Sequence, residues 1–172
     1  MTHQNRRKST ASGPQGVTPI QIRRASNGDS GPIADLIVRT KRLNNEFDPL
    51  FAVVANAKSR AEKYIASTMR SQDKLLLVAA DGSKIVGVLR AETRERMFYD
   101  PHVEGLITDF YILPEYRRKA LGNQIIKQAS TELMKLGAQI IVADVPTQNE
   151  IATRFYVKRR FRSLNQFFGK IS

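Results

Sequence analysis

Residues 112–123, ILPEYRRKALGN, join an apolar segment to a basic turn and then to the start of an amphipathic helix. Apolar residues at three- and four-residue spacing indicate the helix, and Gly137 is a suitable residue for its end. These apolar residues are Leu121, Ile125, Ala129, Leu133 and Leu136. The first turn of a helix leaves backbone N–H groups unpaired at the positive end of the helix dipole, and Arg117, Arg118 and Lys119 add full charges beside it. The stretch therefore predicts a strand, an anion-binding turn and a helix, unless the three charges are merely solvated.

Two motifs in this half of the chain resemble those of one enzyme superfamily. Arg-x-x-Ala-x-Gly at residues 117–122 resembles the (Q/R)-x-x-G-x-(G/A) pyrophosphate motif of the GNAT N-acetyltransferases, and residues 109–117 resemble the strand that precedes it. Residues 149–161 resemble the N-x-x-A-x-x-F-Y-x-K-x-G-F helix of the same superfamily, in the expected order and about 30 residues later. Together the motifs cover about 50 residues, so the resemblance is more specific than either motif alone.

Patterning along the rest of the chain predicts one mixed α/β domain. The expected strands lie near residues 20–22, 75–80, 85–94, 105–113, 139–145 and 163–171, with a hairpin turn at 81–83. The expected helices begin at Asp29 or Ser30, at about Lys58, after the basic turn, and at about Glu150. The order β-α-α-β-β-β-α-β-α-β, with a mixed sheet in a three-layer fold, is also what the GNAT resemblance implies. Residues 19–172 are expected to form this domain, and residues 1–18 to be a disordered basic tail.

Composition excludes several classes of function. The 172 residues include no cysteine, which rules out disulfides and a thiolate nucleophile, and only two histidines, so no metal site is expected. No apolar run is long enough for a membrane span or a secretory signal, and we expect a soluble, cytoplasmic protein without a membrane partner.

The net charge of +12 requires an anionic partner to be considered. From Arg117 to the end of the chain there are eleven Lys and Arg against three acidic residues, so the excess is concentrated around the predicted anion site. Acetyl-CoA is the cosubstrate that the GNAT resemblance implies, and its phosphates would use part of this charge. Nucleic acid would use this charge too, but acetyl-CoA is the favoured partner. The sequence also allows a homodimer.

The resemblance implies which residues bind acetyl-CoA. The backbone groups of Phe110, Tyr111 and Ile112 would contact the pantetheine arm, whereas the side chains at 110 and 112 are expected in the core. The pyrophosphate would lie at residues Arg117, Arg118, Lys119, Ala120, Leu121, Gly122 and Asn123. Asn149 would bond the pantetheine, cap the following helix, or do both. Ala120 departs from the usual glycine, and a positive φ there would cost on the order of 1–2 kcal/mol.

Catalysis by such an enzyme needs an acid for the departing thiolate and a base for the amine. Tyr156 matches the family's tyrosine acid, and a phenol of pKa about 10 is able to protonate a thiolate; the alternative is a core aromatic. Asp144 resembles in position a glutamate of ribosomal-protein-type N-terminal acetyltransferases, and Asp109 an aspartate of polyamine acetyltransferases. Either aspartate is alternatively part of an ordinary ion pair.

The sequence therefore predicts an acetyl-CoA-dependent N-acetyltransferase. The amine acceptor is expected to be a protein N-terminus or a small molecule, because a polycation would be repelled by a chain of charge +12. The alternative is a noncatalytic GNAT-like module that senses acyl-CoA or binds nucleic acid, which the charge and Ala120 favour and Tyr156 and Asn149 oppose.

Overall fold

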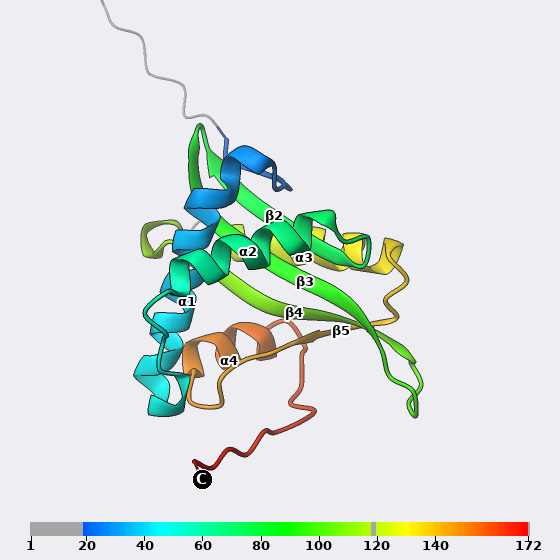
Figure 1. Ribbon diagram of the computed structural model, residues 1–172. Coiled ribbons are helices and arrows are strands. Elements are labelled where there is room, and N and C mark those ends of the chain that lie inside the picture. The colour runs from blue at the N-terminus through cyan, green and yellow to red at the C-terminus, as the bar shows by residue number, and fades with distance from the viewer. Residues whose placement is uncertain (1–18, 118–119, 172) are drawn as a thin grey trace, which may run out of the picture.

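A computed structural model describes residues 19–117 and 120–171 (Figure 1). The strands are β1 (Gln21–Arg24), β2 (Lys74–Asp81), β3 (Lys84–Glu95), β4 (Val103–Ile112) and β5 (Ile140–Ala143). The helices are α1 (Ser30–Phe47), α2 (Ala57–Arg70), α3 (Leu121–Lys135) and α4 (Glu150–Val157), with short 3-10 turns η1 (Asn27–Asp29), η2 (Pro49–Phe51) and η3 (Pro114–Tyr116). The predicted mixed α/β class is confirmed, and the predicted tail at residues 1–18 lies outside the described residues.

The sheet has the strand order β1-β2-β3-β4-β5, and its first four strands run antiparallel. A two-residue turn joins β2 to β3, and Gly82 has a φ of +58° there, which glycine adopts without steric cost. Helix α3 then carries the chain across the sheet, so β5 lies parallel to β4. The hairpins and the parallel unit that the sequence predicted are both present.

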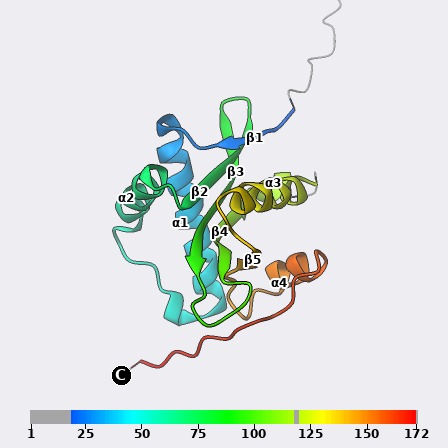
Figure 2. The same cartoon turned by 90° about the vertical axis from the view of Figure 1, so that its right-hand side faces the viewer.

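Helices cover both faces of the sheet and give three layers (Figure 2). Helices α1 and α2 pack on one face, and α3 and α4 lie on the other. Strands β2 and β3 are buried on both faces for most of their length, which agrees with their nearly continuous apolar sequence. Helix α3 ends at Gly137, which has a φ of +97°, as its sequence predicted.

The start of α1 differs in detail from the prediction. Asp29 occupies the N-cap position, but its carboxylate does not bond the helix. It accepts hydrogen bonds from Arg23 at 2.7 and 3.0 Å and from the backbone N–H of Ser26 at 2.7 Å, which ties β1 to the helix start. These bonds, with Arg23 first among them, hold the pKa of Asp29 far below its usual range.

The strand predicted at residues 163–171 is wrong. Residues 162–171 form no strand, and the sheet ends at β5 within the described chain. The apolar residues of this segment, Leu164, Phe167, Phe168 and Ile171, follow the spacing i, i+3, i+4, i+7 rather than alternating. No single strand face therefore collects them, and they are more than half exposed. The segment passes η2, where a Cβ atom added to Gly169 would lie 3.4 Å from Leu50.

Candidate active site

The pairing of strands β4 and β5 ends close to the residues where the acetyl-CoA site is expected. Their parallel pairing ends at Ile107 and Ala143, although β4 continues to Ile112. The last bond of the ladder runs from the N–H of Asp144 to the carbonyl of Ile107 at 2.9 Å. The next donor of a parallel ladder would be two residues further, at Pro146, which has no N–H. The sequence thus stops the pairing and leaves the β5-facing edge of β4 without a strand partner beyond this point.

A bulge in β4 accompanies this separation. Residues Arg90 and Ala91 of β3 pair with Asp109 and Ile107, so Thr108 is the extra residue of β4. A bulge bends its strand and redirects the side chains that follow. Asp109 consequently faces α1 and α2, and Phe110 faces α4, where its ring centroid lies 5.5 Å from that of Phe155.

The helix α3 begins at the predicted anion-binding turn. Ala120 has φ 54° and ψ 5°, a left-handed conformation, so the position needs the positive φ that was expected to penalise alanine. Arg117 does not extend into the turn: its Nε donates to the carbonyl of Ile112 at 3.0 Å, and its guanidinium lies 5.4 Å from the centre of the Tyr111 ring. The predicted contributions of Arg118 and Lys119 lie outside the described residues.

Close packing couples the start of α3 to α4. A Cβ atom on Gly122 would lie 2.8 Å from Cε2 of Phe155 and 3.7 Å from Ile112, so only glycine fits without moving the ring. The side chains of Ile112 and Leu121 are buried, and that of Phe110 is half-buried against the core, which confirms the prediction that the side chains at 110 and 112 pack in the core. The glycine of the motif is explained here by helix-to-helix contact rather than by its φ angle.

Helix α4 carries Asn149 and Tyr156. Asn149 Oδ1 accepts from the N–H of Ala152 at 3.0 Å, so the predicted helix cap is present. Tyr156 is 8% exposed, and its ring packs against Phe155 at 5.2 Å and Phe161 at 5.1 Å between centroids. No described residue hydrogen-bonds its hydroxyl, and burial raises the pKa of the phenol well above its usual value. Tyr156 is therefore protonated at neutral pH, while its ring belongs to the core.

The motif comparison did not single out Arg159, which joins α4 to the start of α3. Its guanidinium carbon lies 3.4 Å from the centre of the Phe155 ring, and its nitrogens donate to the carbonyl of Phe155 and to Asn123 Oδ1. Burial lowers the pKa of this guanidinium, and its buried Nε has no hydrogen-bond partner among the described residues. An open pocket of about 610 Å³ adjoins it, lined by Asn123, Ile126, Lys127, Ser130, Lys158, Arg159 and Phe161. Three basic side chains in one pocket suit an anionic ligand.

The two candidate carboxylates lie in different surroundings. The side chain of Asp109 is fully buried: Tyr64 donates to its Oδ2 at 2.9 Å, Thr108 donates to the same oxygen at 3.2 Å, and Lys41 Nζ lies 2.6 Å from its Oδ1. Asp144 follows the end of β5, and its side chain is exposed. No ion pair or hydrogen bond to the Asp144 carboxylate occurs among the described residues.

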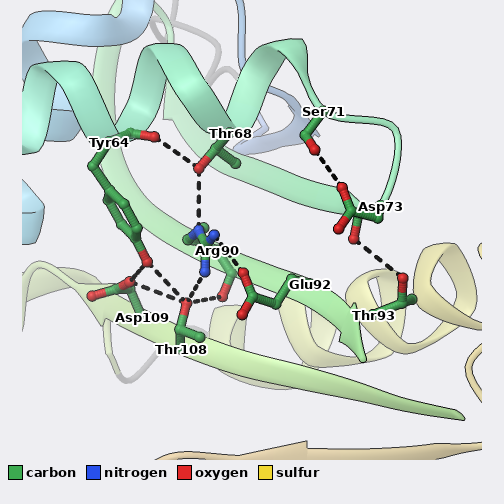
Figure 3. A network of polar contacts seen from close by, with 9 residues as sticks. All are labelled: Tyr64, Thr68, Ser71, Asp73, Arg90, Glu92, Thr93, Thr108 and Asp109. Carbon is green, nitrogen blue, oxygen red and sulfur yellow. Dashed lines mark hydrogen bonds and ion pairs between the residues drawn. The ribbon is translucent and has the colours of Figure 1, made fainter. Parts of the chain in front are cut away.

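A cluster of polar side chains lies between α2 and the bulge (Figure 3). Arg90, only 4% exposed, donates to Thr68 at 3.1 Å, to Thr108 at 2.9 Å and to Glu92 at 2.6 Å. Its guanidinium also lies 4.4 Å from the centre of the Tyr64 ring. Burial, followed by the charge of Asp109, raises the pKa of the Tyr64 phenol. Sequence reasoning missed this cluster, although an arginine within the apolar run of residues 85–91 is a usable signal.

Two general features of the described chain bear on the class of site. Across residues 19–117 and 120–171, no three His, Asp or Glu side chains gather closely enough to hold a metal ion. No helix in these ranges combines the length and the apolar composition that crossing a membrane requires.

Known proteins resemble this chain in sequence pattern and in fold. The sequence model of the acetyltransferase (GNAT) family matches residues 40–161. The apo aminoglycoside 6'-N-acetyltransferase AAC(6')-IG from Acinetobacter haemolyticus has a TM-score of 0.69 at 16% identity, over 88% of this chain and 99% of that one. The aminoglycoside N-acetyltransferase AAC(6')-Iy in complex with CoA has a TM-score of 0.73 at 13% identity, over 94% and 99%. A transcriptional regulator from Bacillus halodurans C-125 has a TM-score of 0.69 at 18% identity, over 90% and 100%. These identities show a shared fold, and no curated protein matches the sequence.

Proposed function

Because this chain belongs to the GNAT acetyltransferase family, we propose that it transfers an acetyl group from acetyl-CoA to a primary amine. The observation that supports the proposal is the end of the β4–β5 pairing at Ile107, beyond which β4 lies beside Phe155 of α4 and that ring contacts the first turn of α3. An extended thioester arm needs backbone partners along its length, and the unpaired edge of β4 offers them. The acceptor is a small-molecule amine or a protein N-terminus.

Acetyl-CoA would bind along three consecutive surfaces. The backbone of Phe110, Tyr111 and Ile112 would hold the pantetheine arm, together with the amide of Asn149. The first turn of α3, from Ala120 to Asn123, would hold the pyrophosphate with the charges of Arg118 and Lys119, whereas the predicted contribution of Arg117 does not fit its bond to the carbonyl of Ile112. The pocket lined by Lys127, Lys158 and Arg159 would take a further phosphate of the cosubstrate, which also supplies a partner for the buried Arg159 Nε.

The chemistry requires two proton transfers. The free amine attacks the thioester carbonyl, a C–N bond forms, and the C–S bond breaks. Tyr156 would protonate the departing sulfur as a phenol that carries its proton at neutral pH, although burial, which raises its pKa, makes it a weaker acid than a free tyrosine. Asp109 or Asp144 would take the proton that the amine loses. Asp144 is exposed and without a charged partner in the described chain, whereas Asp109 is already in contact with Lys41.

A thiol-release assay tests the proposal. Acetyl-CoA is supplied with a panel of α-amino peptides, lysine peptides, polyamines and aminoglycosides, and CoA production is followed for the parent and for Tyr156→Phe. Acceptor-dependent CoA release by the parent, with acetylated product in the mass spectrum, supports the enzyme. Calorimetric binding of acetyl-CoA with no release for any acceptor would instead support a noncatalytic acyl-CoA-binding module.

A further inference from the structure

The contact between Lys41 and Asp109 has an arrangement that differs from an ordinary surface ion pair. The side chain of Asp109 is fully buried, whereas that of Lys41 is 45% exposed, so the lysine reaches inward from solvent to the carboxylate. Lys41 Nζ lies 2.6 Å from Oδ1, yet the approach lacks the angles of a hydrogen bond, and Oδ1 has no hydrogen-bond donor among the described residues. The lysine supplies charge but leaves this oxygen able to accept a well-aligned donor.

The rest of the cluster holds Asp109 without neutralising it. Tyr64 and Thr108 donate to Oδ2 and fix the carboxylate. Arg90, the other buried cation, is paired with Glu92 at 2.6 Å. Lys41 is consequently the one cation that the described structure puts in contact with Asp109, and any ligand that displaces it has to bring a positive charge of its own.

We infer that Asp109 forms the cation-binding end of the acceptor pocket and that the Lys41 ammonium occupies, in the free protein, the place of the acceptor's ammonium. The inference rests on the proposed transfer to an amine. An acceptor that replaces Lys41 keeps the charge of the cluster balanced, and the displaced lysine is free to extend into water on its flexible stem.

The inference narrows the acceptor class. The group that Asp109 now contacts is an ammonium on an unbranched methylene chain. A ligand that fits the same space carries an unbranched aliphatic primary amine, whereas a protein N-terminus usually carries its amine on a branched carbon. An amine on an unbranched aliphatic carbon, in a small molecule or in a lysine side chain, is therefore the expected acceptor rather than a protein N-terminus.

Chemical rescue of a truncated lysine tests the site without any turnover. Lys41→Ala removes three methylenes and the ammonium, and n-propylammonium replaces those atoms. We expect n-propylammonium to raise the Tm of Lys41→Ala by several degrees, whereas tetramethylammonium at equal concentration has no such effect. Lys58→Ala, which removes an exposed lysine paired with Asp35, and the double variant Lys41→Ala, Asp109→Asn should not respond to either. A Tm of Lys41→Ala that ignores n-propylammonium, or responds equally to tetramethylammonium, overturns the inference.

The parent protein provides a second readout, which holds even if Lys41→Ala does not fold. High concentrations of n-propylammonium compete by mass action with the Lys41 ammonium for Asp109 and shift the lysine toward solvent. The side-chain NMR signals of Lys41 should then move toward those of an exposed lysine such as Lys58, whereas tetramethylammonium at equal concentration leaves them in place. Lys41 signals that respond equally to both salts, or to neither, overturn the inference.

Kinetics connect the site to the reaction. With an aliphatic amine acceptor, Lys41→Ala should lower the KM for the amine and leave the KM for acetyl-CoA unchanged, because no internal cation has to be displaced. A KM for the amine that stays the same or rises would contradict the inference. If no amine is acetylated at all, the proposed function fails, while the melting and NMR results still decide whether Asp109 binds an ammonium.

Discussion

The residues of the candidate site have two kinds of role: proton transfer, which is proposed, and packing, which the structure shows. Tyr156 combines both, because its ring packs against Phe155 and Phe161 while its hydroxyl, which no described residue hydrogen-bonds, is the proposed proton donor. Gly122 and Phe155 have a packing role alone, because their contact fixes the distance between α3 and α4. Variants that remove one atom therefore separate chemistry from packing more cleanly than truncation to alanine.

Tyr156→Phe should lower turnover by about 10²-fold, because it removes the hydroxyl that is proposed to protonate the thiolate and keeps the ring. Single-turnover acetyl transfer measures the effect, since product release does not mask it. The Tm and the Kd for acetyl-CoA should stay close to those of the parent. Turnover equal to the parent would return Tyr156 to a purely structural role.

The Asp144→Asn variant should lose kcat/KM at neutral pH and recover part of it as rising pH deprotonates the free amine. We expect this of Asp144 because its carboxylate is exposed and has no charged partner among the described residues. The pH profile of kcat/KM from pH 6 to 9 measures it, with Asp109→Asn in parallel. If both variants match the parent at every pH, solvent takes the proton and neither aspartate is the base.

Asp29→Asn should make the free energy of unfolding less dependent on pH in the acidic range. Arg23 stabilises the carboxylate form and lowers the native pKa of Asp29 below the unfolded value of about 3.9, so this contribution is present at neutral pH and is lost as the pH falls below about 5. The variant should be less stable at pH 7 by roughly 1–2 kcal/mol and show a flatter decline toward pH 2. Urea unfolding at several pH values measures both. Asp35→Asn, in an exposed pair with Lys58, should change stability by less than about 0.5 kcal/mol.

At the scale of whole elements, the turn before α3 has an alanine, Ala120, in a left-handed backbone conformation that disfavours this residue. Ala120→Gly should stabilise the protein by about 0.5–1 kcal/mol, because glycine relieves the left-handed strain and loses part of that gain to its greater freedom when unfolded. Thermal unfolding measures the shift. The same change in a helix interior, Ala66→Gly in α2, should instead destabilise by about 0.5–1 kcal/mol. Equal effects of the two substitutions would show that the turn carries no strain.

Elements were predictable from sequence wherever the signal was local. The hairpin at Gly82, the strand before Pro114 and the helix that ends at Gly137 follow from turn residues and periodicity over short windows. The strand predicted at 163–171 is absent because the apolar residues there do not alternate, so no single face of a strand would collect them. The contact of Lys41 with Asp109 depends on how α1 crosses β4, and no local pattern encodes that crossing. The same reason hid the bond of Arg159 to Asn123, which lies on a different helix.

At the scale of the whole molecule, the charge of +12 acts on any anionic ligand, and its general effect has to be separated from the anion-binding turn. The double variant Arg118→Ala, Lys119→Ala should weaken acetyl-CoA binding by about tenfold or more, since the sequence places these two positive charges immediately before the α3 turn that is proposed to bind the pyrophosphate. Lys63→Ala, Arg70→Ala, on helix α2, removes the same charge from the opposite layer. Calorimetric titration at several salt concentrations compares the two. Equal weakening would mean that net charge, not the turn, attracts the cosubstrate.

Pro146 would affect the free-energy cost of binding acetyl-CoA at the site proposed along β4. The pairing of β4 with β5 ends where Pro146 has no N–H group to donate. A ligand that binds along β4 beyond this point would therefore not have to break hydrogen bonds between the two strands. Preorganisation of this kind removes one cost of association, so affinity depends on the contacts made rather than on a rearrangement of the sheet. If the thioester arm binds along β4 as proposed, the edge that receives it forms when the chain folds, because of a proline that need not contact the reacting atoms.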